Sequence, residues 1–286
     1  MLGLGLGLNY SNYVKPPYIL DQIANASGCY SLRQLKAGAT KSVRVRKSGT
    51  IDGLDIGFVE GILDIASLLA FADGGDVFVT TWYDQSKNEY HQTQATAELQ
   101  PRIVTAGEVE INGFGVPSIY FDGSTGLRGS GEIIRFGETS LYLVATIYGT
   151  GTTYVIGSGI AQGFNRRFYL GRERVVIGRF EDNFLHRVNW DIDGSNQASV
   201  VSVGSFGDYT IRAIVNDGDT LSLENYDLNI STGTNADELA IGGRITNNAL
   251  ADFGTARVTE LLFFHEAHSL EKQKTINQKQ IARYPI

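Results

Sequence analysis

Short apolar stretches recur along the chain and are separated by Gly, Asp, Asn and Ser. Apolar and polar residues alternate from Ser42 to Arg46, so Arg44 and Arg46 are expected on one solvated face of a strand. Residues 141–148 are apolar on both faces, as expected of a central strand. The pattern is typical of a β-sandwich or jelly roll. The stretches expected to be strands are 30–35, 43–46, 77–83, 118–121, 141–148, 154–156, 167–170, 175–177, 209–215, 239–241 and 258–264.

Two stretches have helical spacing instead. Residues 63–71 contain good helix formers with apolar residues three and four apart, and Asp73-Gly74-Gly75 is expected to end this short internal helix. A polar helix is expected from Ser269 to about Tyr284. Its apolar stripe is narrow and would pack on the sheet through Leu270, Ile276, Ile281 and Tyr284.

The first 20 residues are predicted to be an extended arm, and residues 21–286 the sandwich domain. Gly and Leu alternate at the start, and Pro16-Pro17 stiffens the segment that follows. Such a segment is either a frayed terminus or a device that docks on a neighbouring subunit. The regular leucines favour docking, through Leu2, Leu4, Leu6 and Leu8.

Composition excludes several classes of function. The formal net charge is -7, so binding to nucleic acid is not expected. Cys29 is the single cysteine, which rules out a disulfide within the chain. The apolar start lacks a basic region and is interrupted by Gly, so we expect no signal peptide. Because no stretch is long and apolar enough to span a bilayer, membrane insertion is not expected.

One series of motifs is more specific. It comprises Tyr30-Ser31-Leu32-Arg33, Val43-Arg44-Val45-Arg46, Asp55-Ile56-Gly57-Phe58, Thr81-Trp82-Tyr83-Asp84-Gln85-Ser86 and Gln100-Pro101-Arg102-Ile103. In this order the motifs resemble the catalytic domain of α-L-arabinofuranosidase B, which implies a concanavalin-like β-sandwich. The second half of the chain resembles a laminin-G-like jelly roll, and the Gly-Leu start is similar to phage virion proteins of tails, fibres and particle surfaces.

The resemblance also implies where catalytic groups would lie. In the family, the nucleophile is a Glu after two adjacent cysteines, and the acid is the Asp of a Gly-Gly-Asp-Asn turn. Here the corresponding stretch, 154–161, has neither a carboxylate nor a cysteine pair, and the turn reads Gly242-Gly243-Arg244-Ile245. Arg cannot act as a general acid. Since a retaining glycosidase needs two carboxyl groups, we expect no enzyme activity of this type.

The family signature Tyr-Asp-Gln-Ser-Gly-Asn-Gly ends here in Ser86-Lys87-Asn88-Glu89, so both glycines are replaced and a different backbone path is expected. Residues 82–85 are candidates for sugar contact. The favoured interpretation is structural, with Trp82 in the core and Asp84 and Gln85 capping a loop.

The predicted carbohydrate contacts lie elsewhere. The loop 244–248 falls where the family's sugar site would be, and it contains hydrogen-bonding groups. With two aromatic residues, the predicted contacts are Arg244, Asn247, Asn248, Tyr154 and Trp190.

No metal or cofactor site is expected. In His265-Glu266-Ala267-His268 the histidines are three residues apart, whereas a zinc-protease helix needs a spacing of four, so we interpret this segment as a surface turn. Asp191-Ile192-Asp193-Gly194 and Asp217-Gly218-Asp219 are interpreted as hairpin turns rather than calcium sites.

Three functions remain open. The first is a phage virion protein made in host cytoplasm. Its expected partners are other virion proteins, further copies of itself, either in a trimer or as many copies docked on a shell or tail, and a host-surface glycan. The second is a glycoside hydrolase with rearranged carboxylates. The third is a carbohydrate-binding module with no role in assembly. Candidate carboxylates for the second are Glu173, Glu181, Asp182 and Asp191.

Overall fold

The computed structural model describes residues 18–135, 139–148, 154–159, 166–171, 174–179, 184–189, 198–206, 210–215, 220–223, 238–246 and 248–284. The arm leucines, Trp190, Asn247, the four candidate carboxylates and the two Asp-containing turns lie outside these ranges. The boundary at residue 20 therefore stays a prediction. Ile19, just before it, is buried against the domain.

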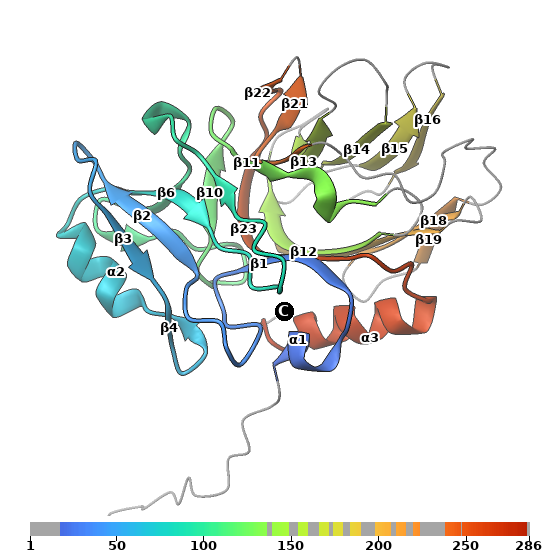
Figure 1. Ribbon diagram of the computed structural model, residues 1–286, viewed down its shortest axis with the longest axis horizontal. Helices are drawn as coiled ribbons and strands as arrows, with labels where there is room; N and C mark the ends of the chain where they lie inside the picture. Colours follow the sequence, from blue (N-terminus) through green and yellow to red (C-terminus); the bar gives the residue numbers. More distant parts are fainter. Residues whose placement is uncertain are drawn as a thin grey trace, which may run out of the picture.

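The first of two layers is an antiparallel sheet with the strand order β3-β2-β6-β8-β10-β23-β12-β17-β18-β19 (Figure 1). The strand β1 pairs with the other end of β23. The bounds are β1 Ala26–Ser31, β2 Val43–Lys47, β3 Gly53–Ile56, β6 Val77–Trp82, β8 Arg102–Thr105, β10 Ile119–Asp122, β12 Ser140–Ile147, β17 Ala198–Phe206, β18 Thr210–Val215, β19 Thr220–Leu223 and β23 Thr255–Phe264.

The second layer has the order β7-β11-β20-β13-β14-β15-β16, and β7 also pairs with β6 of the first layer. Its bounds are β7 Gln92–Thr93, β11 Leu127–Ser130, β13 Tyr154–Gly159, β14 Arg166–Gly171, β15 Arg174–Arg179, β16 Phe184–Asn189 and β20 Glu238–Ile241. Short additions are β9 Glu108–Val109 beside β8, and the hairpins β4 Phe58–Val59 with β5 Ile62–Leu63 and β21 Arg244–Thr246 with β22 Ala249–Ala251. The predicted mainly β sandwich is confirmed.

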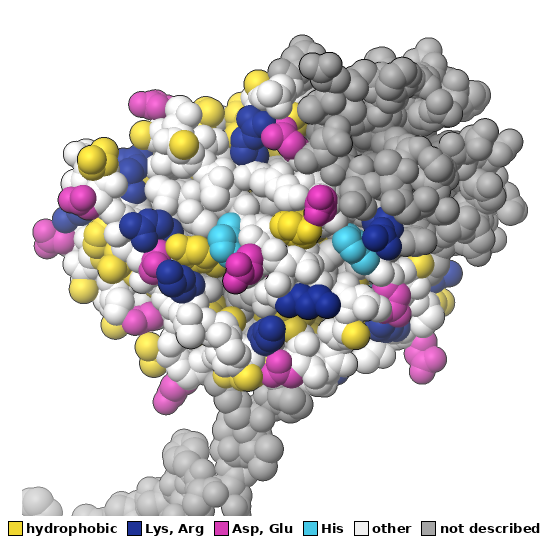
Figure 2. Space-filling view, viewed as in Figure 1, with side chains coloured by type: hydrophobic (Ala, Val, Ile, Leu, Met, Phe, Trp, Pro, Cys, Tyr) yellow, Lys and Arg dark blue, Asp and Glu magenta, His cyan; other side chains and the backbone are white. Residues whose placement is uncertain are grey.

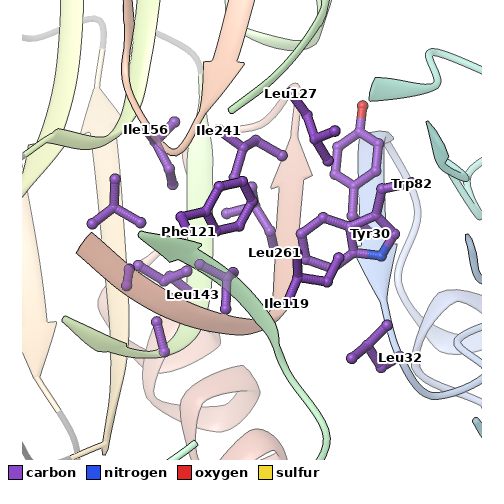
Figure 3. Packing of buried hydrophobic residues seen from close by; sticks show 14 of the residues in the cluster. Tyr30, Leu32, Trp82, Ile119, Phe121, Leu127, Leu143, Ile156, Ile241 and Leu261 are labelled. Carbon is purple, nitrogen blue, oxygen red and sulfur yellow. The ribbon is translucent and has the colours of Figure 1, made fainter. Parts of the chain in front are cut away.

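The main core lies between the two layers (Figure 3). Phe121 and Leu261 of the first layer meet Ile156 and Ile241 of the second, and all four are buried. Trp82 is fully buried, with its ring centroid 5.8 Å from that of Tyr30, so the predicted core position of Trp82 is confirmed. The alternation in β2 is also confirmed, because Val43 and Val45 are buried and Arg44 is exposed.

Three helices flank the sandwich in the described residues: α1 Ile19–Gln22, α2 Ile65–Ala72 and α3 Leu270–Ile281. The internal helix α2 is capped by the Asp64 side chain and ends at Asp73, close to its prediction. The helix α3 begins after Ser269, which caps it, and lies with α1 against the outer face of the first layer (Figure 1). No helix in these ranges is both long and apolar enough to cross a bilayer.

One predicted strand was misplaced. The strand β1 covers 26–31, whereas residues 30–35 were expected to be extended. The Gln85 side chain explains the difference, because its amide hydrogen-bonds to the backbone that a further strand would have paired. Its Nε2 donates to the carbonyls of Ser31 and Arg33, both at 3.0 Å, and its Oε1 accepts from the Leu35 amide at 2.7 Å.

A charged network joins α3 to β23. The carboxylate of Glu260 is fully buried and accepts from Nε and Nη2 of Arg33, at 2.6 and 2.8 Å. Ser31 Oγ, Gln280 Nε2 and Tyr284 Oη also donate to it. Although burial favours the neutral acid, the Arg33 charge and the hydrogen bonds from Arg33, Gln280 and Ser31 lower the pKa of Glu260. The predicted stripe on α3 is thus partly polar, since Gln273 and Asn277 are buried beside Ile276.

The segment 265–268 is a turn, as predicted, but His268 is not at the surface. Its side chain is fully buried, its Nδ1 lies 2.7 Å from Tyr142 Oη, and its amide donates to Ser140 Oγ. The aromatic rings of Tyr142 and Phe264 enclose the imidazole. Burial lowers the pKa of His268 to about 4.

Stability is therefore expected to fall in mild acid. Above pH 6.5 His268 is mostly neutral in both the folded and the unfolded protein. Below pH 6.5 the imidazole of the unfolded chain becomes protonated, whereas that of the folded chain stays neutral until about pH 4. Between pH 7 and pH 5 the free energy of unfolding should fall by about 2 kcal/mol, and most of this decrease should be absent in His268→Gln. Glu266 and Lys272 also face the ring, but Glu266 has a lowered pKa and titrates below this window. Urea unfolding at pH 7, 6 and 5 measures how the free energy of unfolding changes with pH. The same change in wild type and His268→Gln would contradict the role given to His268.

Candidate functional site

An open cleft of about 550 Å³ lies beside the N-terminal end of β2. Two segments line it. One is the connection before β2, which contributes Lys36 and residues 38–41, and the other follows β6 and contributes residues 83–87, Glu89 and His91. Over β2, β3 and β6, Figure 2 shows basic, acidic, histidine and hydrophobic side chains interspersed rather than gathered by kind.

One wall of the cleft is built around Tyr83. Its hydroxyl donates to Asp55 Oδ1 at 2.8 Å, and the same carboxylate pairs with Arg44 at 2.9 Å and with Lys41 at 2.7 Å. These partners lower the pKa of Asp55 to about 2 despite the opposing effect of its partial burial. The Lys41 ammonium lies 5.3 Å from the Tyr83 ring centroid. The ring is therefore held in one orientation at the edge of the cleft.

The floor is made of buried polar side chains that bond to the backbone. Asp84 Oδ1 accepts from the amides of Cys29 and Ser86, at 2.7 and 2.8 Å. Asp84 Oδ2 accepts from Ser86 Oγ at 2.7 Å and from the Tyr90 amide at 3.0 Å. Gln85 ties down residues 31–35, as described above. The predicted loop-capping role of Asp84 and Gln85 is confirmed, and it makes the floor rigid.

Several polar groups in the cleft have no partner of their own. His91 Nδ1 accepts from the Asp84 amide at 3.2 Å, so in the neutral ring the proton sits on Nε2, where it can be donated. The imidazole packs edge-on to Tyr83, with centroids 4.9 Å apart. The side chains of Lys36, Lys87 and Glu89 make no hydrogen bond or ion pair with any described residue.

Glu89 stands where the family signature has its second glycine. Its φ is 58°, in the left-handed region that favours glycine. Holding a non-glycine residue in this conformation costs roughly 1–2 kcal/mol. The expected change of backbone path relative to the family stays a prediction. The turn places an exposed carboxylate at the rim of the cleft.

The cleft is better suited to binding than to acid–base chemistry. Of its two carboxylates, Asp84 is buried and accepts four hydrogen bonds, which leaves Glu89 alone. Glycoside hydrolysis by either common route needs two working carboxyl groups. Among the described residues, no group of His, Cys, Asp and Glu side chains is arranged to hold a metal ion.

Part of the predicted carbohydrate site forms a second cluster, on β13, β21 and β22. The Arg244 guanidinium lies 5.2 Å from the Tyr154 ring centroid and pairs with Asp252. Asn248 accepts from Arg128, which also pairs with Glu238. The structure thus brings Arg244 and Tyr154 together. It adds three charged residues, Arg128, Glu238 and Asp252, which the sequence pattern did not indicate because they lie in separate segments of the chain.

The turn before Arg244 is required by the fold. Gly242 has a φ of 89°, and a Cβ there would lie 2.2 Å from Phe121 Cδ1 and 2.6 Å from the Thr125 carbonyl oxygen. We expect Gly242→Ala to lower the free energy of unfolding by at least about 2 kcal/mol. Gly38→Ala is the matched control, because a Cβ at Gly38 meets nothing within 4 Å. Equal urea midpoints for the two variants would contradict this account.

The sequence interpretation missed most of the cleft. Lys36, Gly38 and Lys41 lie in an irregular connection with no periodic signal, and His91 was not singled out. Tyr83 was named as a candidate for sugar contact, and this was the signal that pointed to the right segment. Its neighbours in the family signature, Asp84 and Gln85, form the floor.

The fold is similar to that of several solved structures. A GH54 α-L-arabinofuranosidase soaked with 4-nitrophenyl α-L-arabinofuranoside superposes with a TM-score of 0.65 at 17% identity, over 91% of this chain and 63% of that one. An arabinofuranosidase complexed with arabinofuranosyl-α-1,2-xylobiose gives 0.65 at 16% identity, with the same coverage. The binding domain of Paraclostridial Mosquitocidal Protein 1 gives 0.50 at 9% identity, over 72% of this chain and 52% of that one.

These likenesses establish the architecture of an arabinofuranosidase-type β-sandwich. The chain spans 63% of the length of the arabinofuranosidases that it matches, so their activity does not transfer with the fold. No family model matches the sequence, and no curated protein does.

Proposed function

We propose that this chain is a non-catalytic carbohydrate-binding domain, carried by a phage virion as a tail, fibre or surface component. The observation that carries the binding proposal is the cleft between residues 36–41 and 83–91, where a fixed aromatic ring lies beside unpaired polar groups on a rigid floor. Sugars present hydroxyls around an apolar ring face, and a fixed aromatic ring with a few placed polar groups matches this pattern.

The polar groups of the cleft complement a polyol. Lys36, Lys87 and His91 Nε2 supply donors, and Glu89 supplies an acceptor. The floor residues Asp84 and Gln85 are already bonded, so they hold the cleft open without competing for the ligand. A preformed site of this kind loses little conformational freedom on binding.

The non-catalytic part of the proposal is supported by two sites. In the turn that corresponds to the family's acid, Arg244 is paired with Asp252. In the cleft, only Glu89 has a free carboxylate among the described residues. Neither site supplies the two carboxyl groups that the reaction needs.

The virion part is supported by the sequence. The Gly-Leu start is similar to phage virion proteins, and a sandwich whose single cysteine, Cys29, is buried and unpaired suits folding in a reducing cytoplasm. We propose that the leucines of residues 1–20 assemble the chain into a trimer or onto other virion proteins. Light scattering of the full chain and of a version without residues 1–20 tests this. A defined oligomer that becomes a monomer on truncation supports it, and identical masses contradict it.

Binding and catalysis are separated by measuring both on one preparation. Fluorescently labelled protein is applied to a glycan array, and the same protein is incubated with 4-nitrophenyl α-L-arabinofuranoside and with arabinan. We expect retention on a defined set of glycans with no release of nitrophenol or sugar. Release above a heat-denatured control would show that a catalytic pair exists and would overturn the non-catalytic assignment.

A further inference from the structure

A second surface, separate from the cleft, is formed by arginines and aromatic residues that alternate across five neighbouring strands. Directly paired positions of an antiparallel sheet share one face. The register aligns one residue from each of β2, β6, β8, β10 and β23, and Tyr148 follows β12 at the end. We call this row the arginine–aromatic strip, and its members are Arg46, Phe78, Arg102, Tyr120, Arg257 and Tyr148.

The members of the strip stack on one another. The Arg46 guanidinium lies 5.0 Å from the Phe78 ring centroid. Tyr120 has two such neighbours, Arg102 at 5.3 Å and Arg257 at 4.6 Å. All six residues are partly exposed, so the strip faces outward. Strands are about 4.8 Å apart, so the three guanidinium groups recur roughly every 10 Å.

The three arginines of the strip differ in the hydrogen-bond acceptors and counter-ions that they contact. Arg257 pairs with Glu110 and also donates to Tyr148 Oη at 2.8 Å. Arg46 donates only to neutral acceptors: the Gln100 side chain and the carbonyls of Lys47 and Ala97. The Arg102 side chain makes no hydrogen bond to any described residue, and its Nε is shielded from solvent. The two terminal nitrogens of this guanidinium are not among the buried atoms and have no acceptor among the described residues, so both can donate to a ligand.

Neither of the two nearby carboxylates pairs with Arg102. Glu110 is committed to Arg257, and the Asp122 carboxylate accepts from its own turn, through Ser124 and Thr125. Asp122 is near enough for the Arg102 charge to help lower its pKa, but the two make no ion pair. A protein with a net charge of -7 therefore carries one locally positive row.

We propose that the arginine–aromatic strip binds a carboxylate-bearing polysaccharide, with the guanidinium of Arg102 pairing with a carboxylate of the chain. Guanidinium and carboxylate form a bidentate pair, which suits a group whose fork has no other acceptor. Charges roughly 10 Å apart suit an extended polyuronate, in which every second sugar turns its carboxylate to the same side of the chain. Nucleic acid fits poorly, because each strand of a duplex carries a phosphate for about every 3.4 Å of helix axis, a much denser charge than that of the strip. Its bases also need open ring faces, whereas guanidinium groups already stack on Tyr120.

Affinity gel electrophoresis tests the proposal with the full chain. The gels contain polygalacturonate, neutral galactan, heparin or no polymer, and a labelled single-stranded oligonucleotide is titrated separately. We expect retardation by polygalacturonate that weakens with salt and is at least fivefold smaller in Arg102→Met. The control Arg283→Met removes an exposed charge just after the C-terminal end of α3 and should behave as wild type.

A second variant, Asp122→Asn, tests the proposal independently in case Arg102→Met folds poorly. Asp122→Asn removes a nearby negative charge and retains the oxygen that accepts from Ser124 and Thr125, so it should bind polygalacturonate more tightly than wild type. Equal retardation of wild type, Arg102→Met and Asp122→Asn would overturn the proposal. So would preference for heparin, galactan or the oligonucleotide, or no retardation at all. Binding in the cleft is unaffected by either result, because Gly38 and Tyr83 are unchanged.

Discussion

Replacing Glu260 with Gln is expected to lower the free energy of unfolding by about 3–5 kcal/mol, the range for breaking a buried ion pair by removing one partner. Glu260 is fully buried, and the Arg33 side chain is 14% exposed. The substitution keeps the shape of the side chain but leaves the Arg33 charge without its counter-ion. Tyr284 and Gln280 would also lose a charged acceptor, so the contact between α3 and the sheet should loosen.

Urea unfolding measures this effect, with an exposed pair as the control. Lys47 and Asp73 are 3.3 Å apart, and the Asp73 side chain is 84% exposed, so Asp73→Asn should cost less than about 1 kcal/mol. Replacing both Arg33 and Glu260 by Met should restore part of the loss, because no uncompensated charge remains. If Glu260→Gln and Asp73→Asn have the same midpoint, Glu260 does not hold α3 to the sheet in the way described.

Regular alternation made part of the fold predictable. The β2 strand is one residue longer than its prediction, and α2 is shifted from its predicted bounds by two residues at one end and one at the other. In both, the burial of apolar side chains decides the structure, so local pattern is sufficient. The end of β1 was not predictable in this way. It is set by Gln85, a side chain more than 50 residues further along, which no local pattern reports.

The candidate site was predictable only through one segment. The family signature drew attention to Tyr83, Asp84 and Gln85, and their mainly structural role was predicted correctly for the last two. The opposite wall, with Lys36 and Gly38, lies in a connection whose position depends on the floor residues. The prediction that His268 lies at the surface was wrong for a similar reason. Its burial depends on Tyr142 and Phe264, which come from two strands.

Blocking the cleft is the second change with a large expected effect. Gly38 lines the cleft, its φ lies outside the left-handed region, and a Cβ built on it meets nothing within 4 Å. An indole at this position should occupy the volume that a sugar needs without disturbing the backbone. We expect Gly38→Trp to weaken glycan binding at least tenfold while the free energy of unfolding stays within about 0.5 kcal/mol of the wild-type value. Ala37→Trp is the matched control, since Ala37 is exposed and does not line the cleft.

Isothermal titration of wild type, Gly38→Trp and Ala37→Trp with one glycan retained on the array tests the cleft most directly. The account predicts that wild type and Ala37→Trp bind with equal affinity and that Gly38→Trp binds at least tenfold more weakly. Equal affinity for all three proteins would contradict it, because the glycan would then occupy another surface of the sandwich.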